Sequence, residues 1–239
     1  MLHQTVKNYS VISHITDSEL VARGNSASPK GMIFHILEDN KIDVEVLDIG
    51  FGGGDLGELI RNNAETSHWA VDGIDGFLQN CHNQRLFEKK VYRNVWHGLA
   101  QSMPSDMFSG YKIICLLDVV EHLTLDTAKW LLRTLLTGMG EDSFLLISTP
   151  LWFYPQGNIQ SGDLEEHLIG VPASSMMALM PHMYAVNEPL VGGFVLSKRS
   201  LDFIEFFHPT TDKNFSYERG MAIAQAIKFQ CAPGFLHKV

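Results

Sequence analysis

The stretch VLDIGFGGGDLG, from Val46 to Gly57, constrains this 239-residue chain more than any other part of its sequence. An apolar run typical of a buried strand reaches Asp48 and then breaks into closely spaced glycines. Glycine has no Cβ atom, so such a turn lets a polar ligand approach the backbone. In open parallel sheets, ligands bind beyond the carboxyl ends of the strands, where this turn would lie. The stretch therefore predicts a ligand-binding α/β domain.

Strand-like and helix-like segments alternate on both sides of this turn. The order predicts an α/β fold with a doubly wound, mostly parallel seven-stranded sheet, helices on both faces, an N-terminal helix and a C-terminal helical tail. Ser28 is expected to cap a helix over 28–39, and Thr124 one that ends at Gly138. The expected strands are 44–49, 68–75, 91–97, 111–117, 143–148 and two that meet near Pro189; the other expected helices are 55–63, 77–89, 201–207 and 217–229.

We expect one domain over residues 1–239. It would comprise an N-terminal cap and helix (1–42), a cofactor-binding core (43–150), and a region with the substrate loop, last strands and helical tail (151–239). The segment 151–172 has no clear period, and loops of such length are often functional. We expect the acceptor pocket to be built from such irregular loops and the tail.

Composition narrows the function classes. With 45% hydrophobic residues the chain can bury a full core, and its net charge of −9 disfavours nucleic acid as a partner. Three cysteines without paired spacing indicate reduced thiols. The sequence carries neither a signal peptide nor an apolar run of ~20 residues, so we expect a cytoplasmic protein without a membrane partner. It gives no signal for an oligomeric state.

Two motifs overlap in the glycine turn. Gly52, Gly54 and Gly57 satisfy G-x-G-x-x-G, which would suggest a dinucleotide. Asp48, Gly50, Gly52 and Gly54 satisfy D-x-G-x-G-x-G, which resembles the first motif of class I S-adenosylmethionine-dependent methyltransferases. An acidic residue about 20 positions further on suits a pair of ribose hydroxyls in either case, so it does not separate the two interpretations.

A second stretch favours the methyltransferase. The segment YKIICLLDVVEHLTLDTAKWLL resembles the fourth-strand region of small-molecule methyltransferases, and FLLISTP resembles their fifth strand. The resemblance covers residues 44–167 and implies S-adenosyl-L-methionine as cofactor, a Rossmann-like fold, and methyl transfer to oxygen or nitrogen of a small-molecule acceptor. The alternatives are an inactive methyltransferase-like binding protein and a nicotinamide-dependent oxidoreductase.

The resemblance also implies a set of cofactor contacts. Asp48 would meet the methionyl ammonium, and Asp75 the ribose. Leu99 stands where many members carry an acid near the adenine. Each aspartate also has a purely structural interpretation, as a turn, surface or capping residue. Arg23 is a further candidate, for the cofactor carboxylate. The full set is Asp48, Gly50, Gly52, Gly54, Asp75, Gly76, Leu99 and Asp118.

Methyl transfer from a sulfonium needs alignment, and an oxygen or nitrogen acceptor also has a proton to lose. The candidate catalytic residues are Glu121, His122 and His167. In a helical turn, Asp118, Glu121 and His122 would share one face. Three interpretations stay open: capping and loop contacts, a base or substrate-orienting role, and a divalent ion, since similar D/E-x-x-E-H arrangements occur in metal-assisted O-methyltransferases. We expect catalysis without a resident metal.

Overall fold

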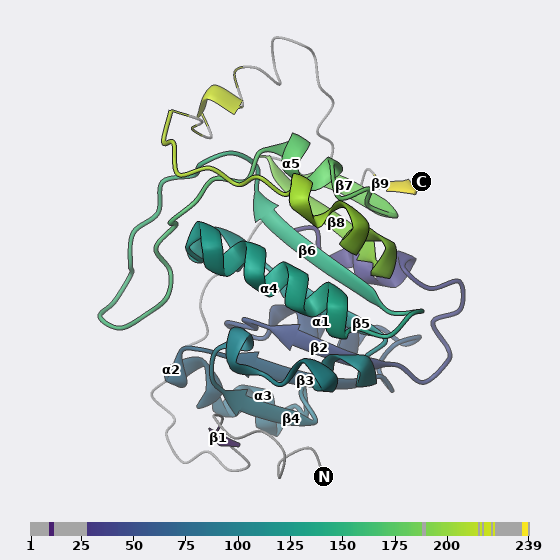
Figure 1. Ribbon diagram of the computed structural model, residues 1–239. Coiled ribbons are helices and arrows are strands. Elements are labelled where there is room, and N and C mark those ends of the chain that lie inside the picture. Colours follow the sequence, from purple (N-terminus) through teal and green to yellow (C-terminus); the bar gives the residue numbers. More distant parts are fainter. Residues whose placement is uncertain are drawn as a thin grey trace.

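The computed structural model describes residues 10–11, 28–187, 190–214, 216, 218–220, 222 and 236–238. Its centre is one sheet in which β2, β3, β4, β5 and β6 run parallel and β8 lies antiparallel between β6 and β7. The order β4-β3-β2-β5-β6-β8-β7 confirms the expected seven-stranded fold (Figure 1). The strands are β2 (Glu45–Ile49), β3 (Ala70–Asp75), β4 (Asn94–His97), β5 (Ile113–Leu117), β6 (Phe144–Pro150), β7 (Met183–Asn187) and β8 (Val191–Ser197), with β1 (Ser10–Val11) and β9 (Leu236–Lys238) at the edges.

The chain leaves β2 on one side toward β3 and later returns to β5 on the other side. The strand order therefore reverses between β2 and β5. In doubly wound sheets this reversal opens a crevice at the carboxyl ends of the strands. The glycine turn directly follows β2, so the fold places it at that crevice.

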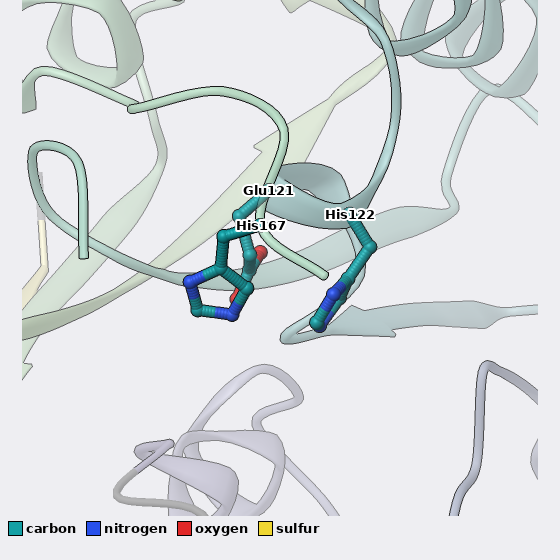
Figure 2. Close-up of side chains that lie close together, drawn as sticks. All are labelled: Glu121, His122 and His167. Carbon is teal, nitrogen blue, oxygen red and sulfur yellow. The ribbon is translucent and has the colours of Figure 1, made fainter. Parts of the chain in front are cut away.

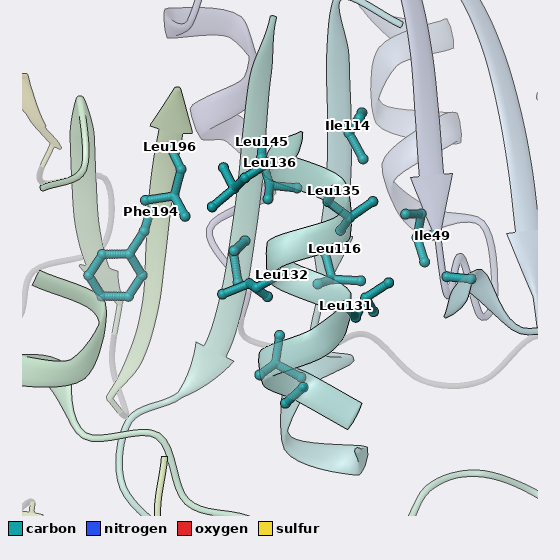
Figure 3. Close-up of a cluster of buried hydrophobic side chains, with 14 of the residues drawn as sticks. Ile49, Ile114, Leu116, Leu131, Leu132, Leu135, Leu136, Leu145, Phe194 and Leu196 are labelled. Atoms are coloured by element: carbon teal, nitrogen blue, oxygen red, sulfur yellow. The ribbon is translucent and has the colours of Figure 1, made fainter. Parts of the chain in front are cut away.

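Alternating side chains of the strands feed two hydrophobic clusters, one on each face of the sheet. One cluster packs under α4 (Leu125–Gly138), whose Leu131, Leu132 and Leu135 are fully buried (Figure 3). Each such leucine contributes roughly 1.5–3 kcal/mol by leaving water. The other cluster packs under η2 (Lys30–His35) and α1 (Asp55–Asn62).

Helix α4 begins as its sequence predicts. Thr124 accepts a hydrogen bond of 3.3 Å from the Thr127 amide, and the helix ends at Gly138. The segment 28–39 differs from its prediction: it forms the 3-10 helix η2, and Ser28 does not cap it. Instead, the Ser28 hydroxyl bonds the Ser148 hydroxyl on β6 at 2.7 Å. Ser28 thus bonds a side chain 120 residues away and not the amides at the start of its own helix.

The expected helix over 77–89 is two short helices separated by His82 and Asn83, and 201–207 is a 3-10 helix. The expected helix over 217–229 lies mostly outside the described residues. Cys81 and Cys115 are buried and unpaired. Within the described residues, no helix combines the length and apolarity needed to cross a bilayer. The remaining elements are α2 (Leu78–Cys81), α3 (Gln84–Glu88), η3 (Ala100–Ser102), η4 (Ser105–Gly110), η5 (Val120–His122), α5 (Ala173–Met177) and η6 (Lys198–Phe206).

Candidate active site

A cavity of about 400 Å³ opens beyond the carboxyl ends of β2, β3, β4 and β5. Its walls come from the segments that follow these strands, from Lys30 on η2, and from the loop after β6. A volume of this size is typical of sites for small molecules and cofactors. The cavity thus gathers on one side of the sheet the segments in which the sequence places its motifs.

The glycine turn forms one wall. Gly50, Gly52 and Gly54 all have positive φ angles, of +69°, +54° and +83°. A Cβ atom on Gly52 would meet nothing within 4 Å, so this residue presents bare backbone to open space. On Gly50 it would lie 2.5 Å from Cγ2 of Val119, and Gly50 therefore makes room for the segment after β5.

Gly54 packs against a neighbouring helix. It precedes α1, and a Cβ there would lie 2.4 Å from Cδ2 of Leu86 on α3. It is not part of the cavity wall that the described residues form. The close approach of α3 accounts for this glycine, and a cofactor contact at Gly54 stays a prediction.

Asp75, at the end of β3, is only 6% exposed and lines the cavity. Its carboxylate accepts hydrogen bonds from the amides of Gly52 at 2.8 Å and Phe77 at 2.7 Å, and from Asn80 Nδ2 at 3.1 Å. The carboxylate is therefore not a solvated surface group. It ties the glycine turn to the end of the neighbouring strand.

Asp48, the last but one residue of β2, is 2% exposed and also lines the cavity. Burial raises the pKa of its carboxyl to about 7, while a hydrogen bond of 2.8 Å from the Tyr92 hydroxyl opposes this increase. Sequence reasoning missed Tyr92, because its only link to the motif is across the fold.

Asp118 follows β5 in a left-handed conformation, with φ +52°. Ser148 on β6 holds it there: the Ser148 hydroxyl donates to Oδ1 of Asp118 at 2.7 Å, and the Asp118 amide donates to the Ser148 carbonyl at 3.0 Å. Such backbone strain in a non-glycine residue persists only where its surroundings impose it. The side chain lies in the cavity wall.

Gly76 lies between two leucines of the cavity wall. A Cβ atom there would be 2.6 Å from Cδ1 of Leu164 and 2.7 Å from Cδ2 of Leu99. Leu99 follows β4, and Leu164 belongs to the loop after β6. This part of the wall is therefore apolar, and the loop after β6 contributes one of its two leucines. The sequence contains no local signal for Leu164.

Glu121 and His122 on η5 lie close to His167 from the loop after β6 (Figure 2). One donor atom from each residue lies within 4.8 Å of the others, and the two imidazole rings meet edge to face with centroids 4.6 Å apart. Glu121 is buried, and its Oε2 atom has no hydrogen-bond partner among the described residues. Asp118 is not part of this donor cluster.

Burial disfavours the charged form of both histidines. Burial, reinforced by the adjacent His167 ring, lowers the pKa of His122 to about 4, and burial also lowers the pKa of His167. Their Nδ1 atoms face the carbonyl oxygens of Glu166 at 3.2 Å and Tyr154 at 2.7 Å. A carbonyl only accepts, so Nδ1 carries the proton and Nε2 keeps a lone pair in each ring. Burial raises the pKa of the Glu121 carboxyl well above its usual value, and the nearby charge of Asp118 raises it further.

Of these three residues, His122 lines the cavity; Glu121 and His167 stand behind it, outside the wall that the described residues define. The structure thus brings the three predicted catalytic residues together, with His122 nearest the space for a ligand. Arg23 lies outside the described residues. The charge of the wall is one-sided: Lys30 is accompanied by five carboxyl groups, those of Asp48, Asp55, Asp75, Asp118 and Glu165.

No protein-family model matches the sequence, and no curated protein matches it significantly. Solved structures do match the fold. The methyltransferase domain of bacterial CtHen1-CN is 16% identical, with a TM-score of 0.50 over 70% of this chain and 96% of that domain. An O-methyltransferase family protein from Burkholderia thailandensis is 10% identical, with a TM-score of 0.50 over 70% of this chain and 55% of that protein.

The plantazolicin methyltransferase BpumL, solved in complex with SAH, is 21% identical, with a TM-score of 0.42 over 53% of this chain and 46% of that protein. This chain spans only 40% to 55% of the length of several other solved structures that share the fold. The structural neighbours include class I methyltransferases, O-methyltransferases among them, at low sequence identity. The comparisons establish the methyltransferase Rossmann-like fold.

Proposed function

We propose that this protein is an S-adenosylmethionine-dependent methyltransferase that acts on an oxygen or nitrogen atom of a small-molecule acceptor. The observation that carries the proposal is the charge of the cavity wall, with five carboxyl groups around a turn of bare backbone. S-adenosylmethionine carries a sulfonium and an ammonium group, which suit such a wall. A nicotinamide dinucleotide would bring a pyrophosphate, whose negative charges the same wall would repel.

The cavity residues fit the cofactor. Gly52 leaves open space over the turn, where the cofactor's methionyl part would pass against the backbone. Asp48 would hold the ammonium group, and Asp75, fixed by three donors, would hold the ribose hydroxyls. Leu99 and Leu164 would contact the adenine through apolar surface. When bound, the cofactor supplies an electrophilic methyl group.

The chain's own contribution to the chemistry is orientation of the acceptor. A histidine with a pKa near 4 is a weak base, so His122 is better suited to accept a hydrogen bond from a hydroxyl or amine than to remove its proton. Glu121 and His167 would position the His122 ring. The unpartnered Oε2 atom of Glu121 and the three clustered donor atoms also favour a second version, in which a divalent ion binds there and orients the acceptor.

A ligand panel tests the cofactor. Thermal unfolding is measured with S-adenosylmethionine, S-adenosylhomocysteine, NAD and NADP, each far above its expected dissociation constant. A ligand at 100 times this constant adds about 2.7 kcal/mol of stability. We expect stabilisation by the two adenosyl compounds and none by the nucleotides; the opposite result would support the oxidoreductase. A binding protein without activity would be stabilised but would transfer no labelled methyl group to a metabolite extract.

The acceptor end needs its own test. His122→Ala should lower methyl transfer by about 10²-fold, the cost of a poorly positioned acceptor, with cofactor affinity nearly unchanged. His68→Ala, far from the cavity, is the matched control. For the version with a metal ion, titration calorimetry with Mn²⁺ should give binding in the wild type and none in Glu121→Gln. No heat in either protein would rule that version out.

A further inference from the structure

Tyr92 lies between α3 and β4, distant in sequence from the glycine turn, and is 8% exposed. Its hydroxyl donates the hydrogen bond of 2.8 Å to Oδ2 of Asp48, 44 residues away. Its ring packs against Phe51 inside the turn, with centroids 5.0 Å apart. Tyr92 therefore supports the turn from outside the cavity wall formed by the described residues.

Two glycines make space for this side chain. A Cβ atom on Gly57, in the first half of α1, would lie 2.8 Å from Cζ and 2.9 Å from the hydroxyl oxygen of Tyr92. One on Gly73, in β3, would lie 2.8 Å from Cδ1 of Phe51 and 3.2 Å from Cδ1 of Tyr92. Val91 Cγ1 comes still closer to the Gly57 position, at 2.6 Å, so Gly57, the last glycine of the G-x-G-x-x-G match, makes room for the neighbouring Val91 and Tyr92 side chains.

A carboxylate as deeply buried as that of Asp48 needs fixed donors, because water no longer solvates it. We propose that Tyr92 is a positioning residue that holds the Asp48 carboxylate for the ammonium group of the cofactor. This inference rests on the proposed function and adds a residue that touches neither cofactor nor acceptor. The hydroxyl occupies Oδ2 and so fixes the orientation of the whole carboxyl group.

Several charged or titratable groups surround Asp48. Together they determine how far its pKa moves when the Tyr92 hydroxyl is removed. Burial raises the pKa of Asp48 to about 7, and the Tyr92 hydrogen bond is the strongest influence in the opposite direction. Removing that bond raises the pKa further, because a donor stabilises the ionised form. The other groups are Asp75 on β3 and Asp55 on α1, which raise it, Lys30 on η2, which lowers it, and the buried thiol of Cys115 on β5.

The test compares the pH dependence of S-adenosylhomocysteine binding in the wild type, Tyr92→Phe and Tyr111→Phe by titration calorimetry. Tyr111 is the matched control, since its buried hydroxyl donates to Oδ2 of Asp72 at 3.0 Å, away from the cavity. If the pKa of Asp48 rises by about one pH unit, Tyr92→Phe binds about fivefold more weakly than the wild type at pH 7 and nearly equally at pH 8.5. Tyr111→Phe should follow the wild-type profile.

A second readout needs no ligand. The carboxyl ¹³C signal of Asp48, assigned by its loss in Asp48→Asn, should titrate at higher pH in Tyr92→Phe than in the wild type. If Tyr92→Phe does not fold, a protein with 3-fluorotyrosine at position 92 is used instead. Fluorotyrosine is similar in size to tyrosine but a stronger hydrogen-bond donor, so it stabilises the ionised Asp48 carboxylate more. The acid limb of binding and the ¹³C titration should then move to lower pH.

The outcomes separate the two proposals. A wild type that binds S-adenosylhomocysteine, with a pH profile that does not move on changing Tyr92, overturns the role of Tyr92 and leaves the proposed function intact. A wild type that binds no S-adenosylhomocysteine at any pH contradicts the proposed function, and the role of Tyr92 with it.

Discussion

Asp75 accepts hydrogen bonds from three donors among the described residues and also lines the cavity. Under the proposed function Asp75→Ala would remove the acceptor for the ribose hydroxyls, and hydrogen bonds to charged groups contribute about 1.5–3 kcal/mol. We expect calorimetry to show at least a tenfold loss of S-adenosylhomocysteine affinity. Unchanged affinity would place the ribose contact elsewhere, though not at Asp72, which is fully buried and paired with Arg93.

Gly52 offers a cleaner test of the turn than Gly50, where a side chain would collide with Val119 before it met any ligand. Gly52→Ala places a methyl group in open space of the cavity, at a cost of about 1–2 kcal/mol for a left-handed alanine. Gly162→Ala is the matched control: its φ is +80°, its Cβ would also meet nothing, and it is not among the cavity residues.

Both glycine variants should lose similar stability in urea unfolding, but only Gly52→Ala should lose S-adenosylhomocysteine binding. Equal affinities in the two variants would show that the ligand does not pass over this turn.

At the scale of elements, the loop after β6 depends on Asp163. Its carboxylate accepts hydrogen bonds from the amides of Ile159 at 2.9 Å, Gln160 at 2.6 Å and Glu165 at 3.3 Å, and Leu164 next to it reaches Gly76. Asp163→Ala should loosen this loop, speed hydrogen exchange over residues 156–166 and weaken S-adenosylhomocysteine binding about tenfold, or 1.4 kcal/mol.

The control for this loop is Asp212→Ala, which removes a similar turn contact, to the Asn214 amide at 2.8 Å, in another exposed loop. It should leave binding unchanged. If Asp163→Ala speeds exchange but binds normally, Leu164 is not part of the cofactor site.

Elements with local signals could be predicted from the sequence. The apolar strands, the Thr124 cap and the leucine face of α4 all follow from spacing along the chain. The helix expected over 28–39 is the shorter 3-10 helix Lys30–His35, and the hydroxyl of its expected cap, Ser28, bonds Ser148 across the fold. The helix over 77–89 breaks in two, and no local pattern revealed the break.

The candidate site divides in the same way. Asp48, Gly52 and Asp75 lie in a compact motif, so their spacing was enough to bring them to one cavity. Tyr92 and Leu164 act across 44 and 88 residues, on Asp48 and Gly76, and a single sequence holds no trace of these contacts. Only the folded structure shows these contacts between the motif residues and distant side chains.

At the scale of the whole molecule, two of the aspartates that the sheet buries have opposite effects on stability. Asp72 on β3 is paired with Arg93 and also accepts from Asn94 and Tyr111. Asp48 has Tyr92 as its side-chain donor, and its pKa is raised by burial from 3.8 to about 7. The paired carboxylate of Asp72 therefore stabilises the folded state, whereas the ionised carboxylate of Asp48, in the cavity wall, destabilises it.

The sign of the Asp48 effect follows from proton linkage. Between pH 4 and 7 the folded protein keeps a proton on Asp48 that the unfolded chain has released, so this residue's contribution to the unfolding free energy falls as pH rises. The loss approaches about 4 kcal/mol above pH 7, at 1.36 kcal/mol for each unit of pKa. Asn cannot ionise but has nearly the same shape, so Asp48→Asn should be more stable than the wild type at pH 8 and equal to it near pH 4.

Urea unfolding of the ligand-free proteins at a series of pH values measures this difference, and the other titrating groups cancel because both proteins share them. Asp72→Asn is the matched control with the opposite sign: it removes the buried carboxylate that pairs with Arg93, whose other ion pair is with the half-exposed Glu45, and should destabilise the protein at pH 8. Asp48→Asn should also bind S-adenosylhomocysteine more weakly, so that stability rises while affinity falls. An Asp48→Asn protein that is no more stable than the wild type at pH 8 would show that the Asp48 carboxylate is well solvated or paired, and not held in the cavity wall for a cationic ligand.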